Sequence, residues 1–175
     1  AYKQARIPIV GVEPATNIAA VALEKDIPTV CDFFGSQLVD KLIEDYGRAD
    51  VIHANNVLAH VPDLNGVVYG LRRFVTDSGV IIVEVPYVRD MVDGTEFDTV
   101  YHEHLCYFSV TALTRLFERH GLVIHDVERL NSHGGSLRIF SGIDDCAAKP
   151  SENVGQLLEQ EAKENIDRSD FYLSF

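Results

Sequence analysis

The sequence predicts an α/β fold whose doubly wound, Rossmann-like sheet is mostly parallel and covered by helices. Short apolar runs alternate with stretches of helical period, and short turns rich in Gly, Pro, Asn and Asp separate them, which is typical of βαβ units. In addition, residues 79–85 (Gly-Val-Ile-Ile-Val-Glu-Val) are apolar on both faces. That pattern is expected of a strand at or near the centre of a parallel sheet with helices on both sides.

Each expected element follows from its local pattern. The expected strands are the apolar runs at residues 7–12, 29–31, 49–54, 79–85, 123–127 and 136–140. Ser36, Asp63 and Ser109 each precede a stretch of helical period, so we expect each of them to cap the N-terminus of a helix. Gly47 and Gly121 are expected to end two of these helices.

Composition and charge describe an ordinary globular chain. The 175 residues are 46% hydrophobic and 24% charged, which suits one domain with a sizeable core. A net charge of -12 repels phosphate backbones, so we expect no nucleic-acid partner and no anionic membrane partner. No apolar run reaches the ~20 residues of a membrane-spanning helix. Cys31, Cys106 and Cys146 are widely spaced, which predicts neither a disulfide framework nor a paired-thiolate zinc site and favours a reducing cytoplasm.

The most informative stretch is residues 101–109 (Tyr-His-Glu-His-Leu-Cys-Tyr-Phe-Ser), where four side chains that can pass protons precede a helix. Burying them together costs free energy unless each has a polar partner, so the cluster indicates chemistry, with a solvated loop as the alternative. In an extended segment His102 and His104 share a face, whereas in a helical turn Tyr101 and His104 do. A histidine beside a carboxylate suits a general base, and His102 with His104 could instead bind a metal.

Polar residues also follow the expected strands, where ligands bind in open α/β sheets. They are Glu13, Asp32, Asn55, Asn56, His60 and Tyr87. Glu13 fits a carboxylate that accepts both ribose hydroxyls, or else an ordinary glutamate before a helix N-terminus. Asp32 and Phe33 could present a carboxylate and a ring face to a flat heterocycle, although at least one of Phe33 and Phe34 is expected in the core. His60 points toward the same rim, or is a structural histidine.

Residues 133–138 (His-Gly-Gly-Ser-Leu-Arg) form another candidate. The two glycines allow close backbone approach to a ligand, and Arg138 is able to bind phosphate. The alternative is a tight strand entry whose glycines only satisfy turn geometry.

Five motifs in unbroken order resemble one family. They are residues 11–19 (Gly-Val-Glu-Pro, then Asn-Ile-Ala), 55–63, 84–87 (Glu-Val-Pro-Tyr), 97–109 and 133–138. Together they are similar to the S-adenosylmethionine-dependent C-methyltransferases that act on nucleotide-linked keto-deoxysugars. The resemblance implies a class I methyltransferase sheet of strand order 3-2-1-4-5-7-6, in which this chain supplies strands 2 to 7 and lacks the first.

The resemblance also implies roles for the cofactor residues. S-adenosylmethionine would be bound through its ribose by Glu13, through its adenine by Asp32 and Phe33, and at its methionine end by Asn55 or Asn56. Its chemistry is methylation of the carbon next to the sugar ketone, once a base has removed the proton from that carbon.

The base implied by the resemblance is His104, with Tyr101 and Glu103 beside it and His60 facing the substrate. The substrate would be a nucleotide-linked sugar, for which the candidates are Tyr87, His133 and Arg138, with Arg73 a weaker choice for the diphosphate. No metal is expected at these residues, and zinc would belong only to an N-terminal module that precedes this chain.

The chain is expected to be the middle of a longer enzyme. It starts without Met and lacks the cofactor loop that precedes the second strand in the family. Residues 1–145 are expected to form a partial methyltransferase domain. Residues 146–175 are expected to be a linker and the opening helix, residues 155–175, of a C-terminal lobe. We therefore expect the isolated chain to bind cofactor poorly or to be inactive.

Three alternatives remain open from the residues. The first is an S-adenosylmethionine-dependent methyltransferase acting on another small molecule, with His104 still the base. The second is a metal-dependent hydrolase using His102, His104 and either His60 or His133. The third is a non-catalytic nucleotide-binding module. The sequence has no pattern that selects a sugar, a carbon or an oligomeric state.

Overall fold

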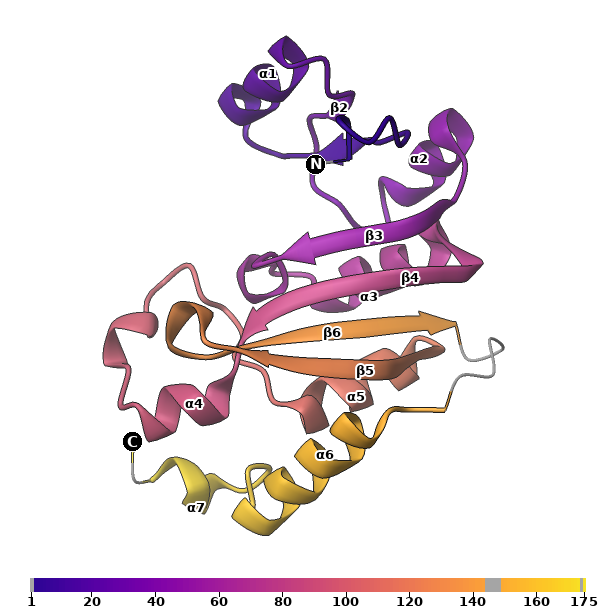
Figure 1. Ribbon diagram of the computed structural model, residues 1–175. Helices are drawn as coiled ribbons and strands as arrows, with labels where there is room; N and C mark the ends of the chain where they lie inside the picture. The colour runs from indigo at the N-terminus through magenta and orange to yellow at the C-terminus, as the bar shows by residue number, and fades with distance from the viewer. Residues whose placement is uncertain (1, 144–148, 174) are drawn as a thin grey trace.

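The computed structural model describes residues 2–143, 149–173 and 175. Its largest sheet has four strands in the order β3-β4-β6-β5, and a separate two-stranded sheet pairs β1 with β2 (Figure 1). The strands are β1 (Gly11–Val12), β2 (Thr29–Val30), β3 (Ala49–Asn55), β4 (Val75–Pro86), β5 (Leu122–Leu130) and β6 (Ser136–Ile143). The pairs β1–β2 and β3–β4 are parallel, whereas β6 runs antiparallel to both β4 and β5, so the sheet is mixed.

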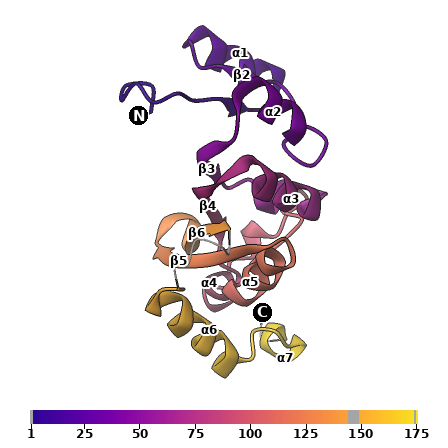
Figure 2. The same ribbon diagram turned by 90° about the vertical axis from the view of Figure 1, so that its right-hand side faces the viewer.

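Helices connect the strands. The α-helices are α1 (Thr16–Glu24), α2 (Val39–Tyr46), α3 (Leu64–Phe74), α4 (Val88–Asp93), α5 (Val110–Arg119), α6 (Glu152–Glu164) and α7 (Ser169–Tyr172), and the 3-10 turns are η1 (Leu58–His60), η2 (Phe97–Thr99) and η3 (Ser132–Gly134). Figure 2 shows α3 and α5 on the same side of the four-stranded sheet. Helix α6 lies alongside the edge strand β5 (Figure 1). No helix in the described part of the chain is long and apolar enough to cross a membrane.

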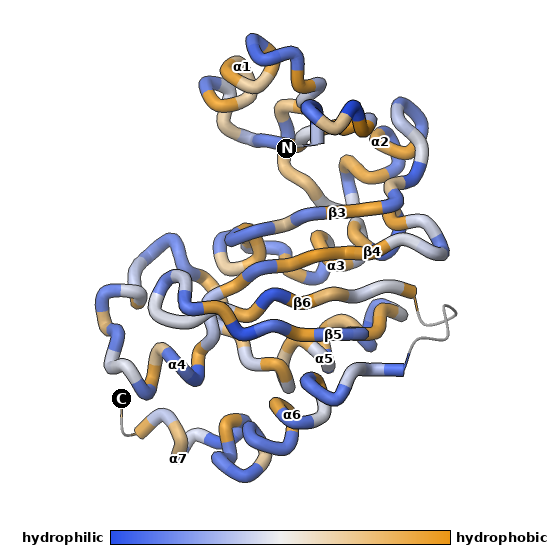
Figure 3. The backbone as a smooth tube through the Cα atoms, viewed as in Figure 1, coloured by the Kyte–Doolittle hydropathy of each residue, from blue (hydrophilic) through white to orange (hydrophobic). Residues whose placement is uncertain are grey.

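The main core lies between β4 and the helices α3 and α5. Ile81, Val83 and Val85 alternate along β4 and are fully buried in this core, as the two-residue period of a strand requires. Hydrophobic residues are accordingly concentrated along β4 in Figure 3. The side chain of the intervening Glu84 points to the other face of the sheet, where it forms an ion pair with Arg138 of the neighbouring strand β6. We expected helices on both faces of the strand, but this second face is partly polar among the described residues.

Two of the three expected caps are confirmed. The Asp63 carboxylate accepts a hydrogen bond from the Gly66 amide at 2.9 Å, and the Ser109 hydroxyl accepts one from the Ala112 amide at 3.1 Å. The prediction for Ser36 is wrong, because α2 begins only at Val39 and residue 38 supplies its N-cap position without a side-chain bond.

The expected strands occur at the expected places but with different lengths. Only Gly11–Val12 of residues 7–12 is paired, whereas β4 extends back to Val75. The expected helix over residues 155–175 is divided, because Asn165 adopts a left-handed conformation (φ 57°) that ends α6 before α7 begins. The expected boundary at residues 145/146 and Cys146 lie outside the described residues.

Candidate active site

Two segments meet at the carboxyl ends of β3 and β4. The first is η1, which follows β3; the second is the His104 segment, defined here as residues 88–109, which connects β4 to α5. The Leu105 amide donates to the Ala59 carbonyl at 2.8 Å, which ties the second segment to the first. The Val88 amide donates to the Phe108 carbonyl at 2.9 Å, so the two ends of the His104 segment are also joined to each other.

The His104 ring is oriented by two hydrogen bonds. Its Nδ1 lies 2.8 Å from the Thr99 carbonyl oxygen, and because a carbonyl only accepts, Nδ1 carries the proton. Nε2 is then the basic nitrogen, and the Tyr101 hydroxyl lies 3.3 Å from it. The backbone forms a turn here, with the His104 amide donating to the Tyr101 carbonyl at 3.0 Å. Of the two arrangements considered from the sequence, the structure therefore has Tyr101 and His104 together.

His60 lies against His104. The two ring centroids are 4.9 Å apart, although the residues come from different loops. The His60 Nδ1 lies 2.9 Å from the Glu103 carbonyl oxygen, so this ring too donates through Nδ1 and keeps a basic Nε2. His60 and His104 thus form a histidine pair whose tautomers are both set by backbone carbonyls.

The other two members of the cluster face solvent. The His102 side chain is 88% exposed and the Glu103 side chain 61% exposed, and 3.9 Å separates the His102 Nε2 from a Glu103 carboxylate oxygen. Glu103 thus contributes its backbone carbonyl to the site, and its carboxylate lies beside His102. Among the described residues, no three His, Cys, Asp or Glu side chains are grouped so that they could hold a metal ion.

A shallow pocket lies at the expected adenine position. It has a volume of about 190 Å³ and runs between Phe33, which follows β2, and Val61 to Asp63, which follow η1. The Phe33 side chain is 74% exposed at its rim, whereas Phe34 packs into the core with its ring centroid 6.3 Å from that of Phe74. One phenylalanine of the pair is thus a core residue, as expected, and the other offers an open ring face.

The remaining cofactor candidates also lie at strand ends. Glu13 follows β1 and accepts a hydrogen bond from the Ala15 amide at 2.8 Å, and Asp32 follows β2 and accepts one from the Phe33 amide at 2.7 Å. Asn55 is the exposed last residue of β3. Asn56 turns the chain with a φ of 54° and donates its amide to the Glu84 carbonyl at 2.7 Å.

Two residues expected to bind substrate are engaged within the protein. Tyr87 is fully buried and its hydroxyl donates to Glu161 at 2.9 Å; burial and the nearby carboxylate raise the pKa of this hydroxyl. Arg138 is paired with Glu84 at 3.1 Å and with Glu128 at 3.2 Å. The Tyr87 hydroxyl is thus committed to a protein carboxylate, and the Arg138 charge is paired with two of them.

The turn at residues 132–135 fits closely against the His104 segment. His133 is exposed, with a φ of 51°. A Cβ on Gly134 would lie 2.0 Å from a Glu96 carboxylate oxygen, and one on Gly135 would lie 2.4 Å from an Asp90 oxygen. The two glycines therefore permit the close approach of protein carboxylates, whereas we had considered the approach of a ligand.

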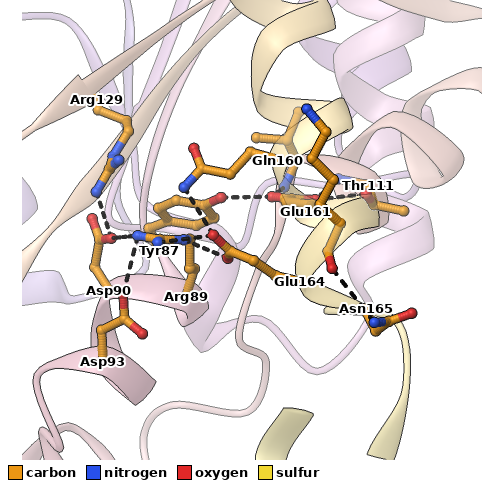
Figure 4. A network of polar contacts seen from close by, with 12 residues as sticks. Tyr87, Arg89, Asp90, Asp93, Thr111, Arg129, Gln160, Glu161, Glu164 and Asn165 are labelled. Carbon is orange, nitrogen blue, oxygen red and sulfur yellow. Dashed lines mark hydrogen bonds and ion pairs between the residues drawn. The ribbon is translucent and has the colours of Figure 1, made fainter.

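The sequence interpretation missed a polar network around Tyr87 (Figure 4). Arg129 lies over the Tyr87 ring at 5.6 Å and pairs with Asp90 at 2.6 Å. Arg89 donates two hydrogen bonds to Glu164 of α6, at 2.6 and 3.0 Å, which raises the pKa of Arg89. The sequence signal for this network is the dense charge of residues 89–93, directly after the central strand.

The chain is similar to known methyltransferases. Residues 1–127 match the family described as a methyltransferase domain. The C-methyltransferase NovU of Streptomyces niveus is 32% identical over 174 residues, which cover 99% of this chain but 41% of that protein. This chain therefore spans about two fifths of the length of that relative.

Solved structures give the fold. An S-adenosylmethionine-dependent methyltransferase from Anabaena variabilis matches with a TM-score of 0.62 at 11% identity, covering 81% of this chain and 71% of that one. Magnesium protoporphyrin IX methyltransferase from Synechocystis, solved with bound S-adenosylhomocysteine, matches with a TM-score of 0.60 at 11% identity, covering 81% and 66%. The fold is that of class I methyltransferases, and the chain belongs to the methyltransferase domain family.

Proposed function

We propose that the protein is an S-adenosylmethionine-dependent C-methyltransferase that methylates the carbon next to the ketone of a nucleotide-linked deoxysugar. The observation that carries the proposal is the histidine pair: the His104 Nδ1 donates to the Thr99 carbonyl at 2.8 Å, so that Nε2 is available as a base beside His60. The similarity to NovU, a protein named as a C-methyltransferase, supports carbon as the methylated atom.

The chemistry requires a base because a carbon next to a ketone becomes nucleophilic only after it loses a proton. His104 Nε2 takes that proton, and the Thr99 carbonyl stabilises the resulting imidazolium through Nδ1–H. The enolate oxygen then needs a hydrogen-bond donor. Tyr101 is the first candidate because its hydroxyl, which donates to His104 Nε2 before proton transfer, becomes free to donate to the enolate once that nitrogen is protonated. His60 Nε2 donates only when the ring is protonated.

S-adenosylmethionine, when bound, supplies an electrophilic methyl group on its sulfonium. Glu13 would hold the ribose, since one carboxylate oxygen accepts from the Ala15 amide and the other is available for a hydroxyl. The open ring of Phe33 and the pocket of about 190 Å³ beside it suit the adenine, with Asp32 at the exocyclic amine. Asn55 and Asn56 would line the methionine end.

The sugar nucleotide would approach from the side of the His104 segment. His133 is exposed on the turn whose Gly134 contacts Glu96, close to the start of η2, which supports a role in substrate binding. Arg138 would reach a diphosphate only by exchanging one of its two carboxylate partners. Tyr87 would act through its buried contact with Glu161.

We further propose that residues 1–145 are a partial class I domain and that residues 146–175 lead into a C-terminal lobe. The gap between the pairs β1–β2 and β3–β4 fits a sheet in which another strand lies between β1 and β3. Any zinc would belong to a module outside these residues. The two free cysteines Cys31 and Cys106 among the described residues suit a reducing cytoplasm.

The test is isotope exchange in the full-length protein. A keto-deoxysugar nucleotide and the enzyme are incubated in heavy water, with and without S-adenosylmethionine, and the sugar is analysed by NMR and mass spectrometry. We expect deuterium to enter at the carbon next to the ketone and the methyl group to appear on the same carbon. Methyl transfer to oxygen or nitrogen, with no deuterium at that carbon, would refute carbon methylation and favour another small-molecule substrate.

A further inference from the structure

One buried carboxylate binds the residues directly before and directly after the His104 segment. Glu161 of α6 is fully buried although it is a charged residue on a mostly polar helix. One carboxylate oxygen accepts from the Tyr87 hydroxyl at 2.9 Å and from the Val110 amide at 2.7 Å. The other accepts from the amide and the hydroxyl of Thr111, at 2.8 and 2.6 Å (Figure 4). Tyr87 directly precedes residues 88–109, and Val110 directly follows them.

This arrangement satisfies groups that would otherwise be costly to bury. The first amides of a helix have no partner within the helix, and Val110 and Thr111 are the first two residues of α5. A carboxylate at that position accepts from both amides and is favoured by the helix dipole. The same carboxylate binds the hydroxyl of Tyr87, so the end of β4 and the start of α5 are held at a fixed separation.

The separation matters because the buried hydrophobic side chains of the His104 segment, Val88, Met91, Val92 and Phe108, lie near its two ends. None of residues 93–107 of this segment, which include His104, is buried. Its base is oriented by a carbonyl within the segment, that of Thr99, so a shift of the segment moves the base with it. A displacement of ~1 Å in a reacting group can cost ~100-fold in rate. Whatever fixes the two ends of the segment therefore contributes to the placement of Nε2.

We propose that Glu161 is a positioning residue for His104, acting through the two ends of the His104 segment; the inference rests on the proposed function of His104 as the base. Other contacts of the same part of the chain support it. Glu164, one turn further along α6, binds Arg89 through two hydrogen bonds, and the ring of Phe175 stacks on that of Phe97 with centroids 4.3 Å apart.

Replacing Glu161 by glutamine tests the chemistry of the contact. All four partners of the carboxylate are donors, and each oxygen has two of them. The glutamine side chain has nearly the same size but carries an NH₂ group in place of one oxygen. In either orientation, that group faces one backbone amide and one hydroxyl. The hydroxyl can rotate to accept from the NH₂ group, but the amide can only donate and is left without an acceptor in a buried site.

Two further variants complete the set. Glu159→Gln is the matched control, because Glu159 lies on the same helix, is 76% exposed and pairs only loosely with Lys163 at 3.9 Å. Thr111→Val keeps the size of the side chain and removes only the hydroxyl bond to Glu161. This second change leaves three hydrogen bonds to the carboxylate and therefore tests the same contact in a protein that folds even if Glu161→Gln does not.

The measurement is amide hydrogen exchange, followed by turnover of the full-length protein. We expect Glu161→Gln to speed exchange at residues 97–109 by about 10-fold or more while β4 and β6 change by less than about 2-fold. Thr111→Val should give a smaller increase confined to the same residues, and Glu159→Gln none. In turnover, kcat should fall by about 10-fold or more for Glu161→Gln, with the KM for S-adenosylmethionine unchanged within about 2-fold.

The outcomes separate the two proposals. Exchange that rises equally over the whole chain in both Glu161→Gln and Thr111→Val, or that does not rise at residues 97–109, overturns the positioning role. A kcat that stays unchanged while exchange rises overturns it as well. Because exchange is measured without substrate, failure of the unmodified protein to methylate carbon refutes the proposed function alone and leaves the exchange result to decide the structural role of Glu161.

Discussion

Replacing His104 by asparagine isolates the basic nitrogen from the rest of the site. The asparagine NH₂ can still donate to the Thr99 carbonyl, as the His104 Nδ1 does at 2.8 Å, but the side chain has no nitrogen lone pair at the position of Nε2. The backbone turn from Tyr101 to residue 104 does not depend on the ring. We therefore expect His104→Asn to fold, to keep its affinity for S-adenosylmethionine, and to lose catalysis.

The expected fall in rate follows from the role of the base. A positioned general base contributes about 100- to 10,000-fold in rate, which corresponds to about 3 to 5 kcal/mol of transition-state free energy. The packing of the His104 ring on His60 and on Tyr101 contributes only about 0.5–1.5 kcal/mol to stability in each case, and both neighbouring rings belong to partly exposed loops. Catalysis should thus fall far more than stability does.

The assay measures transfer of a labelled methyl group by the full-length protein, together with thermal unfolding and cofactor titration of each variant. His102→Asn is the matched control, because the His102 side chain is 88% exposed and should change kcat by less than about 2-fold. If His104→Asn keeps more than about a tenth of kcat, or if His102→Asn loses as much, the assignment of the base is wrong.

Three more outcomes are expected. Phe33→Ala should weaken S-adenosylmethionine binding by about 5- to 100-fold in calorimetry, because its open ring would stack on adenine, and an unchanged Kd contradicts the assignment. Gly135→Ala should lower the free energy of unfolding by about 2–3 kcal/mol in urea titration, because φ is 139° and the new Cβ would lie 2.4 Å from an Asp90 oxygen; a change below about 0.5 kcal/mol contradicts this. Arg89 lowers the pKa of Glu164, so this carboxylate stabilises the fold above its unfolded pKa of about 4.3 and loses that contribution as the pH falls through its lower folded value. Glu164→Gln should therefore lose stability at pH 7 and little at pH 2, and an equal loss at both contradicts the ion pair.

The strands were predictable because burial leaves a direct mark on the sequence. Residues 80–83 and Val85 are apolar because β4 has a neighbouring strand on each edge and helices on one face. The central position was readable from the sequence, whereas helices had been expected on both faces. Strand length was less predictable, since pairing depends on a partner that lies elsewhere in the chain. Residues 7–10 are apolar enough for a strand, yet only Gly11–Val12 pairs with β2.

The site was predictable in part for the same reason. His60 and His104 each follow a strand, and parallel strands β3 and β4 bring their carboxyl ends together, so their meeting follows from topology. The hydrogen-bond partners of Tyr87 and Arg138 were not predictable from the positions of these two residues in the sequence. Each has polar atoms that suit a ligand, and each is paired instead with a glutamate whose place depends on packing far along the chain.

The burial of Glu161 was indicated only weakly by the sequence, through the position of this residue on the helix. Val154, Leu157 and Leu158 form the apolar stripe of α6, and residue 161 continues that stripe at the i+4 and i+3 positions. A glutamate in such a stripe is either exposed or buried with hydrogen-bond donors around it. The free amides at the N-terminus of a nearby helix can supply some of these donors. Ser109, an evident cap, marks such a terminus in the same sequence. Without α6, the Tyr87 hydroxyl and the first amides of α5 would lose their acceptor, so the helix belongs energetically with the segment that carries His104.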